Sequence, residues 1–215
     1  MNILLIDSSS GNIEFALYEN NKISINKKLD SEINADSLIY ELLKELGSSN
    51  RLIKDVDVVS LSNGPGSFTG LRIGSAIAEG ICFANNCKLV EIPTLDIIAN
   101  KYKNDGELIA LIFSNSRTQE FYFAEYKNEK GKMSRTSDYS VKRLEDINMD
   151  NKVIIVNEKT DLHLFENLNI TDLSEISNIQ SHLELTLDNI ERSDFSDYKT
   201  SEPFYMKKFI PLCKK

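Results

Sequence analysis

The stretch that decides the fold reads Asn63-Gly64-Pro65-Gly66-Ser67-Phe68-Thr69-Gly70-Leu71-Arg72-Ile73-Gly74 and holds four of the nine glycines of the chain. Gly64-Pro65-Gly66 predicts a tight turn, because proline presets φ and glycine accepts positive φ or a close backbone. Ser67 or Thr69 then caps a helix over about residues 67–85, and residues 56–62 are typical of a buried strand. Strand, turn and helix aim free backbone N–H groups at one point, which suits a phosphate or a carboxylate. No Walker lysine follows the glycines, so the stretch is not a P-loop.

Small residues recur along one face of the helix that follows this turn. Gly66, Gly70, Gly74 and Ala78 are spaced every four residues, and because glycine costs roughly 1 kcal/mol at a helix position, some contact should compensate. One interpretation is a partner helix that approaches closely, and the other is packing on the protein's own sheet. If the stripe faces a partner, Gly74→Leu should weaken association and leave the monomer folded. The apolar flank of this helix consists of Leu71, Ile73, Ile77 and Ile81.

The composition is that of a globular protein with a hydrophobic core, since 41% of the 215 residues are hydrophobic and 27% are charged. The formal charge of −8 repels phosphate backbones, so we expect contact with nucleic acid only through a partner. Cys82, Cys87 and Cys213 form no C-x-x-C pair and predict reduced thiols, not a zinc site or a disulfide framework. Because the sequence has neither a basic leader nor an apolar run of ~18 residues, we expect a cytoplasmic protein without a membrane span.

The secondary-structure pattern predicts two successive units that begin alike. The first unit, residues 1–105, is expected to form three strands and then helix, strand, helix, strand and helix. That order is the half-unit of the actin-like (ASKHA, ribonuclease-H-like) fold and not of a Rossmann unit. The second unit, residues 106–215, starts with similar strands and then loses its pattern, so we expect a duplicated α/β fold with a smaller, degenerate second half. The predicted strands are 3–6, 13–18, 22–29, 56–62, 88–92, 108–113, 121–126 and 153–156, and the predicted helices are 35–46, 67–85, 94–102 and 183–190.

Four single residues carry chemistry that the pattern alone does not assign. Asp7 follows the first strand, where actin-like ATPases hold an aspartate near the metal and phosphates, or it caps a turn with the serines that follow. Arg117 is an anion clamp or a solvated loop charge. His163 and His182 have no His-x-x-x-His spacing, so we interpret both as structural or surface residues and expect no metal site.

The glycines are confined to the first part of the chain, because none follows Gly131. Actin-like enzymes hold a nucleotide between two glycine-bearing turns, one from each half, because the backbone must approach the phosphates without Cβ atoms. The second turn is missing from this sequence, so we expect no complete nucleotide cleft, no catalytic residue and no cofactor. A vestigial phosphate loop would consist of Asp7, Ser8, Gly64 and Gly66.

Five short motifs resemble the TsaB (YeaZ) family and follow its order along the chain. They are residues 1–9 (MNILLIDSS), the glycine-rich stretch, Pro93-Thr94-Leu95, Arg117-x-x-Glu120-x-Tyr122 and Glu202-Pro203-x-Tyr205. The string G-P-G-S-F-T-G-x-R-x-G within the glycine-rich stretch is highly specific. Between residues 128 and 195 the resemblance rests on length alone.

The resemblance implies a role in making N6-threonylcarbamoyladenosine at position 37 of tRNAs that read codons beginning with A. In this family TsaB is a non-catalytic, degenerate relative of TsaD, which it binds and activates. TsaE, an ATPase, joins the pair, and TsaB forms a homodimer when TsaD is absent. The contact is made by two helices that correspond here to residues 35–46 and 67–85. The implied interface residues are Leu38, Leu42, Leu46, Gly70, Leu71, Gly74, Ile77, Ala78 and Ile81.

Two positions depart from the family pattern. A histidine that is common at the start of the first helix is Asn34 here, and Asp-Ala-Arg is replaced by Asn115-Ser116-Arg117. Both changes remove a ligand or an acid, so the resemblance implies no residual catalysis. Two other functions stay open as alternatives. One is a small actin-like ATP phosphotransferase that uses Asp7 and the Gly64 turn, and the other is a metal-dependent peptidase, although paired histidine ligands are missing.

Overall fold

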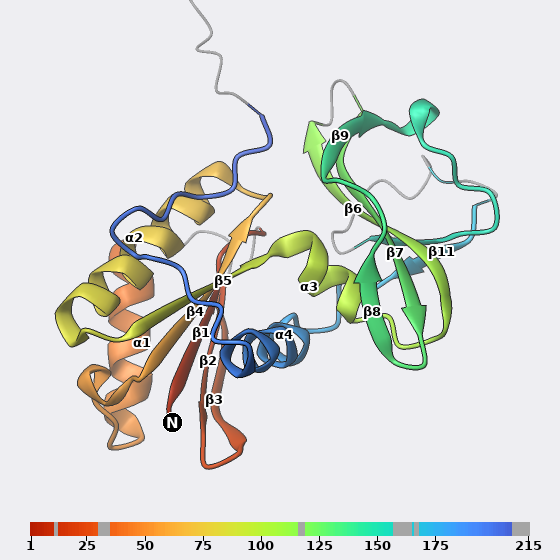
Figure 1. The fold of residues 1–215 in the computed structure, drawn as a ribbon. Helices are drawn as coiled ribbons and strands as arrows, with labels where there is room; N and C mark the ends of the chain where they lie inside the picture. The colour runs from red at the N-terminus through yellow and green to blue at the C-terminus, as the bar shows by residue number, and fades with distance from the viewer. Residues whose placement is uncertain (11–12, 30–34, 116–118, 157–164, 166–167, 208–215) are drawn as a thin grey trace, which may run out of the picture.

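Two β-sheets lie side by side with helices between them (Figure 1). The computed structural model describes residues 1–10, 13–29, 35–115, 119–156, 165 and 168–207. Among these residues, no helix is long and apolar enough to cross a membrane.

The first sheet contains five strands in the order β3-β2-β1-β4-β5. β1 (Ile3–Asp7), β2 (Ile13–Glu19) and β3 (Lys22–Leu29) are antiparallel neighbours, and β4 (Val58–Gly64) and β5 (Lys88–Pro93) extend the sheet parallel to β1. β1 is buried along its whole length, which explains its continuous apolar run. β3 alternates exposed and buried positions because it lies at the edge.

Two helices cover one face of the first sheet. α1 (Ala35–Ser48) buries its leucines at four-residue spacing against that face, and α2 (Phe68–Asn85) packs on β4 and β5 beside it. The resulting core includes Leu4, Ile6, Phe15, Leu38, Leu42, Leu46, Val59, Leu61, Ala78 and Ile81. Because apolar side chains recur every three or four residues on α1, one stripe of the helix is removed from water.

The second sheet repeats the strand order of the first. From one edge it reads β8-β7-β6-β10-β11, with β9 paired to β7 beyond the end of β8. The first three of these strands are antiparallel, and β10 and β11 run parallel to β6, as β4 and β5 do to β1. The strands are β6 (Gly106–Asn115), β7 (Glu120–Glu129), β8 (Lys132–Arg135), β9 (Ser140–Arg143), β10 (Val153–Val156) and β11 (Ile170–Asp172). This repetition confirms the predicted duplicated, actin-like α/β fold.

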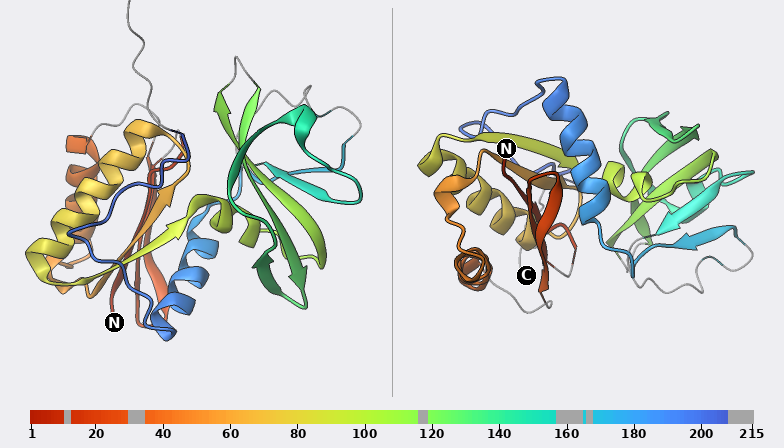
Figure 2. Two further views of the ribbon diagram at one scale, coloured as in Figure 1. Left: turned by 45° about the horizontal axis from the view of Figure 1, so that its top comes forward. Right: turned by 90° about the horizontal axis from the view of Figure 1, so that it is seen from below.

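Two further helices lie between the sheets and interlock the halves. α3 (Thr94–Asn100) follows β5, yet Leu95 and Ile98 pack on β6 and β7 of the second sheet. α4 (Ile179–Glu191) follows β11 and returns to the first sheet, where it packs on β5 and β1. Figure 2 shows α4 between the two sheets when the molecule is seen from below. The division at residue 105 that the sequence predicts stays a prediction, because each half contributes a helix to the other.

The far face of the second sheet is covered differently from that of the first. Ile147, Met149 and Phe165, which belong to no α-helix, pack there against Ile109 and Phe121. Only a short 3-10 turn (Leu144–Asp146) lies between β9 and β10, where the first half has α1 between β3 and β4. In the described residues, the second half therefore has no α-helix between β9 and β10 that would correspond to α1.

Candidate functional site

The carboxylate of Asp7 is the first element of the candidate site. It lies at the end of β1 and is buried. Its Oδ1 accepts hydrogen bonds from the backbone N–H of Ser9 at 3.0 Å and from the Ser9 hydroxyl at 2.6 Å. Its Oδ2 accepts one from Nδ2 of Asn178 at 2.7 Å. Of the two interpretations of Asp7, the turn-capping one is therefore observed, and both carboxylate oxygens are occupied by groups of the same chain.

The glycine turn lies directly against this corner. The backbone N–H of Ser67 donates to the carbonyl of Ser9 at 2.7 Å. A Cβ atom on Gly66 would stand 2.1 Å from that same carbonyl oxygen. Ser67 also caps α2, as predicted, because its hydroxyl accepts from the N–H of Gly70 at 3.3 Å. The glycine turn thus leaves room for the backbone of Ser8 and Ser9 after β1, which we call the serine turn.

The small-residue stripe of α2 faces the interior of the chain. A Cβ atom on Gly70 would lie 2.0 Å from the carbonyl oxygen of Ser8, and one on Gly74 would lie 2.2 Å from the Ser8 hydroxyl. Ala78 is fully buried on the first sheet. Gly70 and Gly74 thus admit Ser8, which directly follows β1, and Ala78 packs in the core of the first sheet. These contacts favour packing within the chain, and the contact of this stripe with a partner helix stays a prediction.

The apolar residues assigned to the partner contact are also largely internal. Leu38, Leu42 and Leu46 of α1 and Leu71 and Ile81 of α2 are buried in this chain, and Ile77 is partly buried. Their burial shows that they stabilise the fold of the single chain. The most exposed large apolar side chains described on the same helices are Tyr40 and Leu43 on α1 and Phe83 on α2, at 64%, 48% and 75% exposure, and Phe68 at the start of α2 is 38% exposed.

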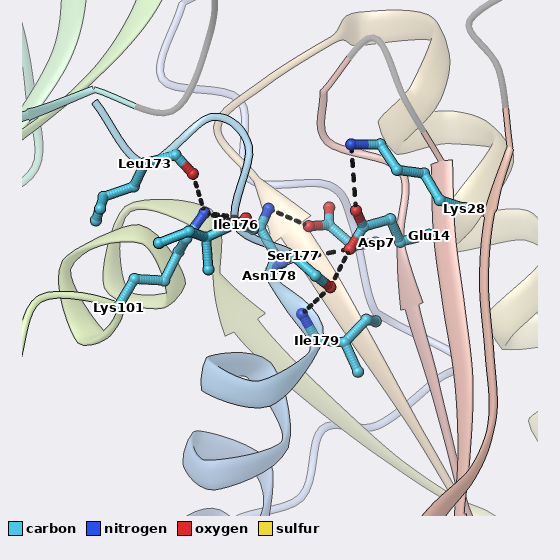
Figure 3. Close-up of polar contacts among 9 residues, drawn as sticks. All are labelled: Asp7, Glu14, Lys28, Lys101, Leu173, Ile176, Ser177, Asn178 and Ile179. Carbon is cyan, nitrogen blue, oxygen red and sulfur yellow. Dashed lines mark hydrogen bonds and ion pairs between the residues drawn. The ribbon is translucent and has the colours of Figure 1, made fainter.

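Asn178 is the hub of a polar network that joins the halves (Figure 3). Its Oδ1 accepts from Nζ of Lys101 at 3.0 Å, and its backbone N–H donates to Oε2 of Glu14 at 3.3 Å. The same Glu14 oxygen accepts from the Ser177 hydroxyl at 2.7 Å, and Lys28 forms an ion pair with Oε1 at 3.7 Å. Lys101 also donates to the carbonyls of Leu173 and Ile176 at 2.7 and 2.5 Å. Sequence reasoning missed this hub.

The charge on Lys101 is held in a partly desolvated place. Burial lowers the pKa of this ammonium group to about 8, while the nearby carboxylates of Glu14 and Asp7 oppose that shift. The group therefore stays mainly protonated at neutral pH and can donate all three of its N–H bonds. Its place at the end of α3 fixes the segment that leads into α4.

Residues 196–207, which we call the C-terminal strap, cross the edge of the first sheet and reach the glycine turn (Figures 1 and 2). The N–H of Phe204 donates to the carbonyl of Asn63 at 2.8 Å, and its own carbonyl oxygen lies 2.9 Å from where a Cβ on Gly64 would stand. Gly64 has a φ of +116°, so this position needs glycine both for its backbone and for space. The ring of Phe204 packs on Tyr139 of the second half at 5.3 Å between centroids.

An open pocket of about 530 Å³ lies beside the strap. It is lined by Asn63, Pro93, Tyr139, Glu202, Pro203, Phe204 and Tyr205. Close by, Nε of Arg72 donates to the Tyr205 hydroxyl at 3.2 Å, and its guanidinium lies 4.0 Å from the ring centre of Phe68. Two of the motifs that carry the family resemblance, around Gly64 and around Tyr205, thus meet here.

His182 is structural, as the sequence predicted. It is completely buried in α4, and its Nε2 lies 3.0 Å from the Ser60 hydroxyl, which is in turn 2.7 Å from the Thr186 hydroxyl. Burial lowers the pKa of the imidazole to about 4, against a smaller opposing effect of Asp7. The imidazole is therefore neutral at pH 7 and closed to solvent.

Several predicted features fall outside the described residues. These are Asn34, Ser116, Arg117, His163 and Cys213, and the side chain of Asn115. Within the part of the chain that is described, no group of three or more His, Cys, Asp or Glu side chains is arranged to hold a metal ion.

Comparison with known proteins agrees with the fold and with the motifs. Residues 30–184 match the family model described as "TsaD: tRNA N6-adenosine threonylcarbamoyltransferase". The protein "tRNA threonylcarbamoyladenosine biosynthesis protein TsaB" of Escherichia coli is 27% identical over 130 residues, which are 60% of this chain and 56% of that relative. The protein of the same name from Buchnera aphidicola subsp. Schizaphis graminum is 31% identical over 58% of this chain and 60% of its own length.

A solved structure described as YeaZ from Pseudomonas aeruginosa covers 95% of this chain and 99% of its own with a TM-score of 0.78. At 18% identity, that likeness supports the fold alone. The sequence matches span a little more than half of the length of the curated relatives. Because the family model matches most of the chain and the named TsaB relatives are 27% and 31% identical to it over 60% and 58% of its length, this chain belongs to the TsaB (YeaZ) family.

Proposed function

We propose that this chain takes part in forming N6-threonylcarbamoyladenosine in tRNA, as a non-catalytic subunit that binds and activates a TsaD protein. The names of its relatives and of the matching family model support the pathway. The observation that carries the non-catalytic role is the state of Asp7, whose two carboxylate oxygens are both taken by hydrogen bonds within the chain.

The closed corner around Asp7 argues against phosphoryl transfer by this chain. In an actin-like enzyme the carboxylate at this position must be free to act near a metal ion and phosphates. Here Asn178 donates to it from the opposite half, and Ser9 fills the glycine turn. Opening the site for a nucleotide would leave a buried carboxylate and the N–H of Ser67 without these partners, and each lost buried partner costs about 1–3 kcal/mol.

The charge of the chain supports an indirect role in tRNA modification. A formal charge of −8 disfavours binding to a phosphate backbone. A subunit of this kind must therefore rely on a partner for contact with tRNA. We propose that TsaD is this partner, that TsaE joins the pair, and that a second copy of the chain takes the same surface when TsaD is absent.

The exposed side of α1 and α2 is the proposed contact surface. Tyr40, Leu43 and Phe83 are large apolar side chains that the fold leaves in water on these two helices. Aromatic side chains of this kind commonly supply much of the binding free energy at an interface. The buried leucines and the glycine stripe behind them hold the helices in place, so their contribution to binding is through the fold.

A reconstituted modification assay tests the proposal directly. TsaD, TsaE, this chain, tRNA and the threonylcarbamoyl donor are combined, and each protein is omitted in turn. We expect the modified nucleoside only when TsaD and this chain are both present, and no ATP hydrolysis or stoichiometric nucleotide binding by the chain alone. Transfer to tRNA by this chain without TsaD would disprove the non-catalytic assignment.

Paired surface variants test the contact. Phe83→Asp places a charge at the most exposed apolar side chain described on α2, which is 75% exposed, and Ile176→Asp places one at a residue before α4 that is 56% exposed. We expect the first to weaken TsaD binding at least tenfold and the second to leave it unchanged, with both proteins folded by circular dichroism. Equal affinities for the two variants would move the interface away from α2.

A further inference from the structure

Two cysteine thiols lie in contact where α2 meets β5. Cys82 is in the last turns of the helix and Cys87 directly precedes β5, and their sulfur atoms are 3.6 Å apart. Both are free thiols. Neither cysteine contacts Asp7 or belongs to the polar network around Asn178, and neither is among the exposed side chains of α1 and α2 proposed as the contact surface.

We propose that Cys82 and Cys87 are an oxidisable dithiol that closes to an intramolecular disulfide when the folded chain meets a hydroperoxide. The fold builds the pair locally. The C-cap of α2 is Asn86, which takes the left-handed conformation (φ 52°, ψ 36°) and turns the chain back so that the Cys87 sulfur contacts that of Cys82 in the helix. Disulfide formation needs the two sulfurs to approach from 3.6 Å to about 2.05 Å.

The two thiols differ in access and in acidity. Cys87 is 9% exposed, whereas Cys82 is fully buried. The hydrogen bond between them lowers the pKa of the Cys87 thiol and raises that of Cys82, which burial raises further. Because the thiolate is the nucleophile, Cys87 is the thiol that meets the oxidant and Cys82 is the thiol that resolves the product.

The reaction balances with one hydroperoxide. The Cys87 thiolate attacks an oxygen of hydrogen peroxide, the O–O bond breaks, and the hydroxide that leaves takes up a proton to form water. The sulfenic acid left on Cys87 is then attacked by the Cys82 sulfur. The S–O bond breaks, a second water leaves with the Cys82 proton, and the S–S bond forms. Two thiols lose two electrons in total, and the peroxide is reduced to two molecules of water.

The test uses the full-length folded chain with Cys213→Ser, so that Cys82 and Cys87 are the only cysteines. After treatment with excess hydrogen peroxide and desalting, free thiols are counted in denaturant and peptides are mapped by mass spectrometry. We expect the loss of both thiols, a peptide pair linked through Cys82 and Cys87, and full recovery of both thiols with dithiothreitol.

Two matched variants and one control complete the test. In Cys82→Ser the sulfenic acid at Cys87 should persist long enough to be trapped by dimedone and then over-oxidise. In Cys87→Ser the remaining buried thiol should react much more slowly. The same protein unfolded in urea shows how fast the link forms without the fold. The proposal is wrong if the folded chain keeps both thiols while glutathione in the same tube is consumed, or if Cys87 over-oxidises with Cys82 present.

Discussion

The two halves of this molecule share one strand order and differ in what covers it. The first sheet is enclosed by α1 and α2 on one face and by α3 and α4 on the other. The second sheet receives α3 on one face, while Ile147, Met149 and Phe165 from irregular segments cover the other among the described residues. The glycine-rich turn and its long helix occur in the first half, and no glycine follows Gly131.

This difference indicates what a duplicated fold can lose without losing its architecture. A nucleotide cleft needs an open turn in each half, whereas the strand order needs only the apolar runs that pair into sheets. The first half keeps its glycine turn, but the backbone of Ser8 and Ser9 after β1 packs into it, and Asn178 of the second half donates a hydrogen bond to Asp7. Contacts of Asn178 with Asp7 and Glu14 therefore join the two halves at this point.

The largest predicted effect comes from a substitution that disrupts the contact between α2 and the serine turn in the first half. Gly70→Ala would bring a Cβ within 2.0 Å of the Ser8 carbonyl oxygen, so we expect a loss of about 3 to 5 kcal/mol in the free energy of unfolding. Gly80→Ala in the same helix meets nothing within 4 Å and should gain about 0.5 to 1 kcal/mol. Urea unfolding of the two variants followed by circular dichroism measures both values.

By the same argument, Gly74→Leu should lower the stability of the monomer, because its side chain would meet Ser8 and Leu61. This reverses the sequence-based expectation of a folded variant with weakened association. Equal stabilities for Gly70→Ala and Gly80→Ala would show that the serine turn does not occupy the stripe in solution.

A second prediction concerns the helix that the second half contributes to the first sheet. His182 on α4 has a folded pKa of about 4 against an ordinary value of 6.5, so between these pH values the unfolded chain binds more protons than the folded one. At about 1.4 kcal/mol per pH unit, stability should fall by roughly 3 kcal/mol from this residue as the pH drops from 6.5 to 4. Carboxylates also titrate in this range. The quantity to compare is therefore the change in the free energy of unfolding with pH, measured for wild type and for His182→Gln. If the two proteins lose stability in parallel over that range, His182 is not buried in its neutral form.

The third prediction tests the hub that ties the halves together. Asn178→Ala removes the donor to Asp7 and the acceptor for Lys101, so two polar groups of the first half lose their partner from the second half. We expect a loss of about 2 kcal/mol by urea unfolding. Gln180→Ala, two residues along on the exposed side of α4, is the matched control and should change stability by less than about 0.5 kcal/mol. If both variants lose equally little, the hub does not hold the halves.

The smallest predicted effect concerns an exposed ion pair between the halves, for comparison with the buried hydrogen bonds of Asn178. Nζ of Lys103, just after α3, lies 2.7 Å from Glu184 of α4, but the two side chains are 59% and 40% exposed. Lys103→Ala should therefore cost less than about 1 kcal/mol, and salt should reduce that cost further. Stability measured at low and high ionic strength gives the comparison. A loss as large as that of Asn178→Ala would make the surface pair as important as the buried hub.

The strands and helices of the first half were predictable because apolar runs and turn residues agree there. Residues 3–6 are apolar and end at a turn, and Ser67 precedes a clear helix with its cap. β9 and β11 were missed because they are four and three residues long and largely half-exposed, so no apolar run marks them. α4 begins at Ile179 and not at residue 183, and its start is set by Asn178 and Ser177, which bond to Glu14 far away in sequence.

The candidate site was predictable in its residues and not in its contacts. Asp7, Gly64 and Gly66 were identified from position and residue type, but one partner of Asp7, Asn178, is 171 residues away, and no local pattern encodes such a pairing. The spacing of Gly70 and Gly74 fits a partner helix and the protein's own β1 equally well. Only tertiary packing, which brings Ser8 against both glycines, decides between them.

The return of α4 and of the C-terminal strap to the first sheet has a consequence for synthesis on the ribosome. Ile3 and Leu5 are translated first, yet Ile179 and Leu183 complete the core on their side of the sheet. The carbonyl of Asn63 likewise gains its hydrogen bond from the N–H of Phe204 only after residue 204 has been synthesised. A nascent chain that has released only its first half therefore exposes part of an apolar sheet face until α4 emerges. Such surfaces favour aggregation, so this order of events makes the unfinished chain a natural client for chaperones.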